Sequence, residues 1–339
     1  MTSTLTHIET SPAARTRGIR VQRGIAIGFV LLAALIVLGA VLVPGFVSPR
    51  NMRSILLLAA FLGLASLGQT LCALVGALDL SIPYLIGGAN ILYPTLLVAG
   101  LPAWLAVVVV VALGAAVGFG NGLLSFKLQG QALIMSLGVG FAVVGAVQLY
   151  TSLGSEFSGT VFAPVPNWLR NFAAFNGKTF GFSMPPVVIL WLVMTGCTIW
   201  ALYNTWFGRS IYAIGGSRVA AARLGISEFR VWTAIHALSG GMSALTGVLL
   251  LGFSGGGYVG VGDPYLFTTV AAVVIGGTSL LGGMGGYGAS VLGVLVLTVL
   301  TSLLVGLGLS FAAQQAIVGL LIVPMVAIYA RSPHIRNQI

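Results

Sequence analysis

Long apolar runs, separated by short polar stretches, are the main pattern of this chain. Ten of these runs approach the ~20 helical residues that cross the ~30 Å hydrocarbon core of a bilayer. They occupy residues 25–43, 54–77, 83–99, 104–126, 132–153, 185–207, 231–253, 266–281, 286–307 and 312–330. The pattern predicts an all-α, polytopic membrane protein with about ten transmembrane helices, which form one transmembrane domain over residues 25–330.

Two features leave the number of spans open. The stretch 54–80 contains Gly63, Gly68 and Gly76, and glycine weakens a helix interior, so two shorter pieces are the alternative to one span there. For the whole chain, eight spans with re-entrant segments are the alternative to ten. Ten spans place both termini on the same side of the membrane.

The composition supports the same class. Hydrophobic residues make up 58% of the 339 residues and charged residues only 6%, against about 25% charged in soluble domains. The chain has too few charged groups to cover an ordinary cytosolic enzyme, and it is too apolar for a disordered chain. Its 48 glycines suit the close approach of helices within a bilayer.

The basic residues predict the orientation. The formal net charge of +10 would also fit a protein that binds nucleic acid, but the charges are not spread along the chain. Eleven of the fifteen basic residues fall on one predicted side: Arg15, Arg17, Arg20, Arg23, Lys127, Arg209, Arg218, Arg223, Arg230, Arg331 and Arg336. The positive-inside rule makes that side cytoplasmic, so the tails 1–24 and 331–339 are cytoplasmic and we expect no nucleic-acid partner.

The remaining four basic residues, Arg50, Arg53, Arg170 and Lys178, fall in predicted outer loops. The longest of these loops, 154–184, has the length to fold over the mouth of the protein or to contact a partner. The inner loop 208–230 is the most charged internal stretch, with alanines at 220–222 near its centre. This loop predicts a short amphipathic helix on the cytoplasmic face.

Two protease-like motifs lack a catalytic partner. The sequence Gly-Phe-Ser-Gly at 252–255 needs a histidine within hydrogen-bond reach of Ser254. His236 is expected near the opposite end of the same helix, about 25 Å away at 1.5 Å per residue. The sequence Gly-Val-Gly-Asp at 260–263 needs a second aspartate, and Asp79 is expected near the inner end of its span whereas Asp263 is expected in an outer loop.

Other sequence motifs also fail in their context. Gly-Met-Gly-Gly-Tyr-Gly at 283–288 matches a dinucleotide-binding fingerprint, which needs a strand before it and a helix after it. Here it lies between two predicted spans and is expected to be a turn. The chain has no Walker sequence, and Cys72 and Cys197 lie inside apolar runs without metal-ligand spacing. We therefore expect no catalytic residues and no metal in this chain.

Asp79 is the main candidate for a functional polar site. An acidic residue among apolar surroundings is costly and marks a functional site by default. We expect Ser81 to cap the following helix and Pro83 to fit its first turn, and the structural alternative is that Asp79 accepts backbone N–H bonds there. The polar residues with which we expect the solute pathway to be lined are Gln69, Asp79, Ser81, Asn90 and Asn121. For Gln69, Asn90 and Asn121, as for Gln148, Gln314 and Gln315, the structural alternative is that the amide side chain forms a hydrogen bond between two helices.

Five stretches in order resemble one family. They are Gln-Thr at 69–70 leading to Leu-Asp-Leu-Ser at 78–81, Gly-Asn-Gly-Leu at 120–123, the run 205–226, Ala-Ala-Val-Val-Ile-Gly-Gly-Thr-Ser-Leu-Leu-Gly-Gly at 271–283, and Gln-Gln at 314–315. Together they resemble the permease subunits of ribose-, xylose- and galactose-type ABC importers. The match extends from Asn51 to Arg331, and 205–226 is its most specific part.

The chain departs from the family pattern at several positions. Ser217 replaces an asparagine, residues 266–269 replace an acidic segment, residues 131–138 depart from a proline-containing motif, and Ala313 replaces a tryptophan. These departures leave the fold intact and leave the identity of the sugar open. They would also fit a permease that pairs with a different, homologous permease chain.

The resemblance implies an ATP-driven importer built from several chains. Residues 219–235 follow the spacing of the ABC permease coupling motif, with Val219 in place of its acidic residue and without its usual ending. The predicted ATPase-coupling residues are Ser217, Ala220, Ala221, Ala222, Arg223, Leu224, Gly225 and Ile226. We expect Ala221, Leu224 and Ile226 to form an apolar face that seats in a groove of the ATPase.

The implied partners are cytoplasmic ABC ATPase subunits, a periplasmic or extracellular solute-binding protein, a second permease that is identical or homologous, and membrane lipid. ATP and Mg²⁺ belong to the ATPase, so this chain is expected to hold no cofactor and not to be an enzyme. The predicted location is the bacterial inner membrane, and the predicted cargo is a monosaccharide or related small polyol. The alternatives are an ABC permease for a nucleoside, autoinducer or amino acid, a stand-alone channel or secondary carrier, and an intramembrane protease.

Overall fold

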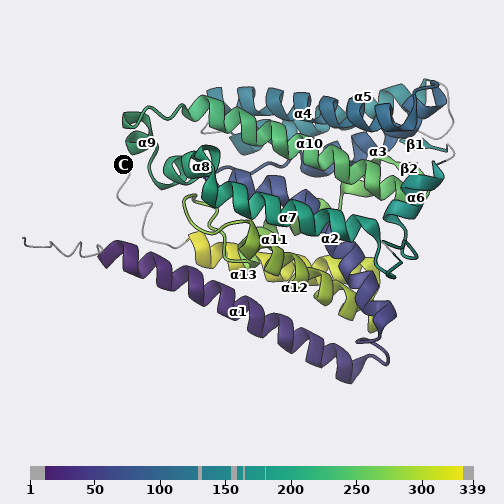
Figure 1. Ribbon diagram of the computed structural model, residues 1–339, viewed down its shortest axis with the longest axis horizontal. Helices are drawn as coiled ribbons and strands as arrows, with labels where there is room; N and C mark the ends of the chain where they lie inside the picture. Colours follow the sequence, from purple (N-terminus) through teal and green to yellow (C-terminus); the bar gives the residue numbers. More distant parts are fainter. Residues whose placement is uncertain (1–11, 129–131, 154–158, 163–164, 180, 331–339) are drawn as a thin grey trace, which may run out of the picture.

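The computed structural model describes residues 12–128, 132–153, 159–162, 165–179 and 181–330. The helices in these residues are α1 (Pro12–Leu42), α2 (Pro49–Leu74), α3 (Ile82–Val98), α4 (Ala103–Lys127), α5 (Ala132–Ser152), α6 (Asn167–Ala173), α7 (Pro186–Asn204), α8 (Trp206–Gly216), α9 (Arg218–Arg223), α10 (Glu228–Ser254), the 3₁₀ helix η2 (Val259–Gly262), α11 (Tyr265–Ile275), α12 (Tyr287–Gly306) and α13 (Phe311–Ala330). Two short strands, β1 (Thr160–Val161) and β2 (Gly257–Tyr258), pair antiparallel, with Thr160 opposite Tyr258. The long helices lie side by side along the long axis of the molecule (Figure 1).

Each of the ten predicted apolar runs contains a helix. Within the described part of the chain, α2, α4, α5, α7, α10 and α12 are long and apolar enough to cross a membrane. Four shorter apolar stretches accompany them: Ala26–Leu42, Ile82–Val98, Val259–Ile275 and Phe311–Leu321. The all-α polytopic class is confirmed, and the number of spans stays a prediction.

For the stretch 54–80, the structure favours one span over the alternative of two pieces, because α2 runs unbroken through Gly63 and Gly68. A Cβ atom at Gly63 would collide with the Trp191 indole of α7, and one at Gly68 would collide with Ser239 of α10. These glycines therefore let α7 and α10 approach α2 closely. The chain leaves the helix only after Leu74, where Gly76 adopts a left-handed φ of 76°.

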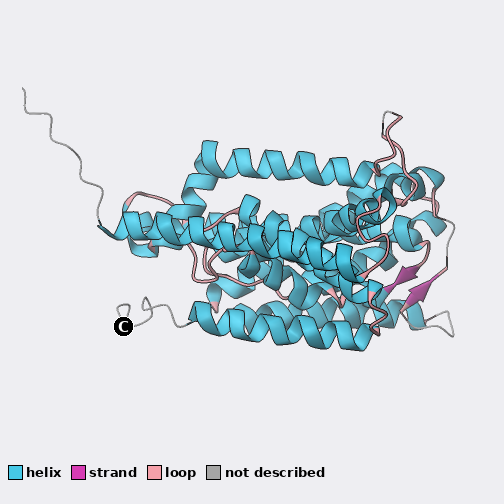
Figure 2. Cartoon of the chain, turned by 90° about the horizontal axis from the view of Figure 1, so that it is seen from below, coloured by secondary structure: helices cyan, strands magenta, loops and turns pink. Residues whose placement is uncertain are grey.

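The two ends of the molecule differ. At one end, hereafter the α9 end, lie α8 and α9 together with the start of α1 and the finish of α13; α6 and the two strands lie at the opposite α6 end (Figures 1 and 2). The predicted inner loop 208–230 and outer loop 154–184 are thus at opposite ends. Because α1 begins at Pro12, the second half of the predicted tail 1–24 is helical, while residues 1–11, 154–158 and 331–339 lie outside the described residues.

After α10 the chain turns at Gly255, whose φ is 76°, and runs back along α3 as residues 255–264, hereafter the return segment. The Val259 carbonyl packs against Gly87, and Gly262 packs against the Pro83 carbonyl at the start of α3, both too closely to admit a Cβ atom. The expectation that Asp263 lies in an outer loop is therefore wrong. A glycine-rich backbone permits this approach, because no side chain separates the two segments.

Candidate functional site

The link 75–81 between α2 and α3 is non-helical, and Val75, Ala77, Asp79 and Ser81 are buried in it. Backbone without helical hydrogen bonds is tolerated at membrane depth only where protein or a water-filled cavity satisfies it. Here the Leu80 N–H donates to Ser136 Oγ at 2.8 Å, and the Ser81 N–H donates to Asp79 Oδ1 at 3.0 Å. Side chains thus replace the helical bonds that the link gives up.

Asp79 is the centre of a buried polar cluster, hereafter the Asp79 cluster, which comprises Asp79, Ser81, Asn121, Ser136 and Ser239. Its Oδ1 accepts from Ser81 Oγ at 2.6 Å, Ser136 Oγ at 2.8 Å and Asn121 Nδ2 at 3.2 Å, and its Oδ2 accepts from Ser239 Oγ at 2.7 Å. The donors come from the link, α4, α5 and α10. Asp79 therefore joins four parts of the fold through one carboxylate that is only 1% exposed.

This arrangement decides between two expectations for the start of α3. Asp79 does accept a backbone N–H, from Ser81, as the structural alternative predicted. The Ser81 side chain makes no capping bond to α3, so the predicted Ser81 cap is wrong; its hydroxyl donates to Asp79 and accepts from Asn121 Nδ2. Pro83 occupies the first turn of α3, as expected.

The other predicted pathway residues lie apart from the cluster. Asn90 donates to the Gly247 carbonyl at 2.9 Å and accepts from the Tyr258 N–H at 2.8 Å, so it ties α3 to α10 and β2. Gln69 is fully buried in α2, and neither of its amide atoms has a hydrogen-bond partner among the described residues. Ser136 and Ser239 were not predicted, although Ser239 stands before two glycines that allow close approach.

A cavity of about 250 Å³ lies among α3, α4, α5 and α10. Thr95 and Tyr150 are the only residues in its lining with a polar side chain. Binding sites for small polar molecules need several convergent polar groups for orientation, so this cavity is a poor fit for a sugar.

The short helix α9 is well defined at both ends. Ser217 accepts the Ala220 N–H at 3.3 Å as N-cap. At the other end Gly225 has a φ of 74°, and the Ile226 N–H donates to the Ala221 carbonyl at 3.1 Å, which is the Schellman pattern. The predicted helix in the inner loop is thus present, and the chain turns after it at Gly225.

The predicted apolar face of α9 is only partly correct. Ala221 is buried against the rest of the protein, whereas Leu224 is 76% exposed, so the two side chains do not share one exposed face. With only six residues, α9 presents an exposed side formed instead by Val219 and Leu224. These two apolar side chains project at the α9 end of the molecule.

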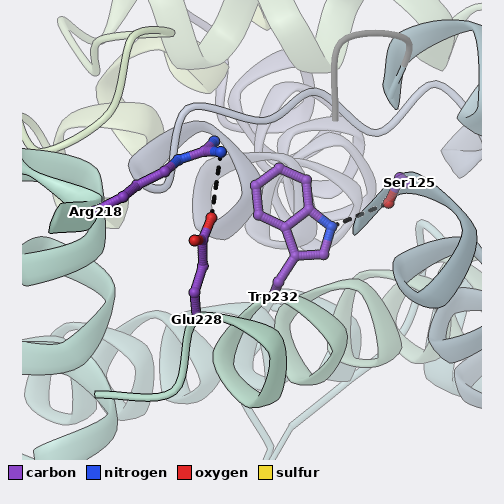
Figure 3. A network of polar contacts seen from close by, with 4 residues as sticks. All are labelled: Ser125, Arg218, Glu228 and Trp232. Carbon is purple, nitrogen blue, oxygen red and sulfur yellow. Dashed lines mark hydrogen bonds and ion pairs between the residues drawn. The ribbon is translucent and has the colours of Figure 1, made fainter. Parts of the chain in front are cut away.

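A second group of contacts joins α9 to the long helices (Figure 3). Arg218 forms an ion pair with Glu228 at 3.2 Å, and its guanidinium carbon lies 5.3 Å from the centre of the Trp232 ring. The Trp232 Nε1–H donates to Ser125 Oγ of α4 at 3.0 Å. Arg218, Glu228, Trp232 and Ser125, hereafter the Arg218 clamp, connect α9 with α10 and α4.

The Arg218 clamp and the Asp79 cluster lie along the same face of α10. The Trp232 ring stacks on His236 with centres 5.3 Å apart, and Ser239, about one turn further, donates to Asp79. Residues spaced three or four apart are neighbours on a helix surface. Trp232, His236 and Ser239 therefore form a row on one face of α10, from the Arg218 clamp toward the Asp79 carboxylate.

The enzyme-like motifs are excluded by geometry. Ser254 and His236 are 18 residues apart on α10, or about 27 Å. The Asp79 oxygens accept from serine and asparagine donors, and none of the described hydrogen bonds links them to Asp263. The glycine-rich sequence 283–288 follows a turn and not a strand, with the Gly283 N–H donating to the Leu74 carbonyl at 2.8 Å.

Comparison with known proteins gives the family. Residues 51–326 match the family described as the branched-chain amino acid transport system / permease component. The chain is 31% identical over 303 residues to the ribose import permease protein RbsC of Bacillus subtilis (87% of this chain, 89% of that protein), and 32% identical over 297 residues to the probable ABC transporter permease protein YphD of Escherichia coli (88% and 86%). It is 30% identical over 308 residues to the fructose import permease protein FrcC of Rhizobium meliloti (88% and 83%).

The family match and the apolar helical fold together define the class of the protein, a membrane transport component. The chain belongs to this family of ABC import permeases, which confirms the resemblance drawn from its motifs. It is a multi-pass protein of the bacterial inner membrane.

Proposed function

We propose that this chain is the transmembrane subunit of an ATP-driven importer for a monosaccharide or related small polyol. The observation that carries the proposal is the family match over residues 51–326, together with relatives named for ribose and fructose import. The proposed assembly has two permeases, two cytoplasmic ATPase domains that use ATP and Mg²⁺, and a binding protein that delivers the solute. Because the family description names branched-chain amino acids, an amino acid is the alternative cargo.

The exposed side of α9 is the proposed contact with the ATPase. Leu224 and Val219 are apolar side chains in water at the α9 end, and apolar anchors of this kind carry much of the energy at interface centres. The Arg218 clamp holds α9 to α10, so a displacement of α9 would move α10. Further along the same face of α10, Ser239 donates to Asp79. This bond is the proposed point at which α10 acts on the link 75–81.

The α6 end is the proposed docking face for the binding protein. Arg50 and Arg53 lie 6.0 and 5.5 Å from the centre of the Phe175 ring. A nearby hollow of about 380 Å³ is lined by residues that include Trp168, Asn176 and Lys178. A basic face of this kind attracts an acidic protein surface.

The cargo is tested on the binding protein encoded beside this gene. The purified protein is screened for ligand-induced thermal stabilisation with ribose, fructose, xylose and galactose, and with leucine and a nucleoside as comparisons. Stabilisation by a sugar is expected, because a ligand that binds only the folded state raises its stability. Stabilisation by leucine alone would establish the amino-acid alternative.

A further inference from the structure

Asp263 presents a carboxylate at a depth where lipid would be the neighbour. Asn90 of α3 bonds to Gly247 of α10, seven residues before α10 ends at the α6 end. Pro83, whose carbonyl touches Gly262, lies another seven residues inward along α3. At 1.5 Å per residue, Asp263 is about 20 Å from that end of a helix about 40 Å long.

The Asp263 side chain is nevertheless exposed. The structure contains no hydrogen bond or ion pair to its carboxylate from any described residue. An exposed, unpaired charge facing hydrocarbon is costly, and such residues face a water-filled cavity or the interior of an assembly instead. The irregular backbone of the return segment supports the same conclusion, because non-helical backbone at this depth is tolerated only where it is buried in protein or lines a water-filled cavity.

The neighbours of Asp263 suit a polyhydroxylated solute. Tyr84 follows Pro83, whose carbonyl packs against Gly262, so Tyr84 and Asp263 are the next residues of two segments in close contact. The Tyr84 ring contacts the ring of Phe141 of α5, with centres 5.3 Å apart, and Phe141 is itself exposed. A carboxylate that accepts from hydroxyl groups, beside an aromatic face that packs on C–H groups, combines the polar and apolar contacts of a small-molecule site.

We infer that Asp263, Tyr84 and Phe141 form a solute-contacting site on the wall of the translocation path. This inference rests on the proposed function, in which the second permease closes the path opposite this wall. The Asp263 carboxylate accepts hydrogen bonds from the solute, and the Tyr84–Phe141 pair packs against its carbon skeleton. The face of the molecule that carries α3, α5 and η2 is thereby assigned to water and solute, and not to lipid.

Thiol labelling in membrane vesicles tests the assignment. Cys72 and Cys197 are first replaced by alanine, and then Asp263→Cys is compared with Val193→Cys, an exposed position near the middle of α7. Because the thiolate is the reactive species and forms in water, a charged sulfonate reagent should label Asp263→Cys at least about tenfold faster than Val193→Cys. Labelling after denaturation gives the total thiol, so poor expression of either variant does not affect the ratio.

Equal labelling of the two positions would overturn the inference, because Asp263 would then lie against lipid or packed protein. In the assembled importer, Asp263→Asn should raise the KM for ribose or fructose by about tenfold, with Asp263→Glu closer to wild type, since one charged hydrogen bond is lost. An unchanged KM would remove Asp263 from the solute site. Failure of the wild-type importer to take up any sugar would contradict the proposed function, while the labelling ratio would still decide which face Asp263 lines.

Discussion

The Asp79 carboxylate accepts hydrogen bonds from four side chains. How many of these bonds a substitution removes determines how far it destabilises the folded protein. Asp79→Asn retains one acceptor oxygen and a similar shape, so much of the protein should still fold. Asp79→Leu removes the acceptor of the buried Ser81, Ser136 and Ser239 hydroxyls, at about 1–3 kcal/mol for each group left unsatisfied. Abundance in the membrane should fall strongly for Asp79→Leu and slightly for Asp79→Asn.

The matched control is Asp263→Leu, which makes the same chemical change at an exposed aspartate and should leave abundance near wild type. Membrane abundance by quantitative blotting is compared between Asp79→Leu and Asp263→Leu, and uptake by the assembled importer is measured for the Asp79 variants alone, because Asp263 is itself proposed to contact the solute. Normal abundance and normal uptake for Asp79→Leu would show that the Asp79 cluster has neither a structural nor a transport role.

Arg218 tests whether α9 is coupled to α10. Arg218→Ala removes both the ion pair with Glu228 and the contact with Trp232, while the exposed Leu224 remains available to the ATPase. The expected result is normal co-purification of the ATPase with fewer solute molecules transported per ATP hydrolysed. A cation–π contact and a partly exposed ion pair are each worth about 1 kcal/mol, so a severalfold loss is expected.

Arg218→Lys keeps the positive charge and should preserve most of the transport per ATP. Arg230→Ala, at another exposed arginine near the start of α10, is the control for loss of charge alone. If Arg218→Ala transports as many solute molecules per ATP as wild type, the Arg218 clamp does not transmit the motion.

Three residues of the Asp79 cluster were predicted from the sequence: Asp79, Ser81 and Asn121. Asp79 stands out because it is an acid in an apolar stretch, and the structure places Ser81 and Asn121 next to its carboxylate. Ser239 was missed because the sequence does not distinguish it from Ser243, one turn later, which donates to its own helix at the Ser239 carbonyl. Which of two such hydroxyls reaches across to another element depends on packing that is absent from the local pattern.

The helix α9 is tested through its exposed anchor. Leu224→Asp places a charge where an apolar contact with the ATPase is proposed, and it should weaken co-purification of the ATPase and abolish uptake. Loss of an apolar anchor at an interface centre costs about 2 kcal/mol or more. Leu224→Met, which keeps an apolar side chain of similar volume, is the control and should bind the ATPase normally.

Because Leu224 is exposed and makes no packing contact that folding requires, both Leu224 variants should reach the membrane at wild-type levels. Docking of the binding protein at the opposite end should also be unchanged. Undiminished co-purification and transport for Leu224→Asp would show that α9 is not the coupling element.

The contact between α2 and α10 depends on Gly68. Because a Cβ at this position would collide with Ser239, Gly68→Leu should force the two helices apart and reduce membrane abundance; overpacking of this kind typically costs about 1–3 kcal/mol. Gly196→Leu, in α7 with no atom within 4 Å of a Cβ there, should express normally. Equal abundance of the two variants, measured by fluorescence-detected size exclusion, would contradict the packing of α2 against α10.

Elements were predicted well where a continuous apolar run exceeded the length of a span, because length and hydropathy alone define such helices. The return segment was misplaced because its glycines at 255–257, 260 and 262 give the composition of a loop. Its packing against α3 depends on Gly87 and Gly262, which allow backbone to approach backbone. Such a contact is a property of the folded chain and leaves no periodic signal.

At the scale of the whole molecule, the basic segments are divided between the two ends. The basic loop 208–230 and the start of α1 share the α9 end, and the basic residues of the predicted outer loops share the α6 end. The positive-inside rule therefore predicts that the α9 end is cytoplasmic. The sequence also predicted the class of transporter, because the motifs that resemble the family recur in order along residues 51–326.

The central claim is that this chain carries solute only when ATP hydrolysis in a partner drives it. The most direct test is reconstitution of the permease into liposomes with its ATPase and binding protein, followed by measurement of radiolabelled ribose or fructose inside. The account predicts accumulation above the external concentration that requires ATP, the ATPase and the binding protein together. Flux through the permease alone, without ATPase or ATP, would identify a channel or secondary carrier and contradict the account.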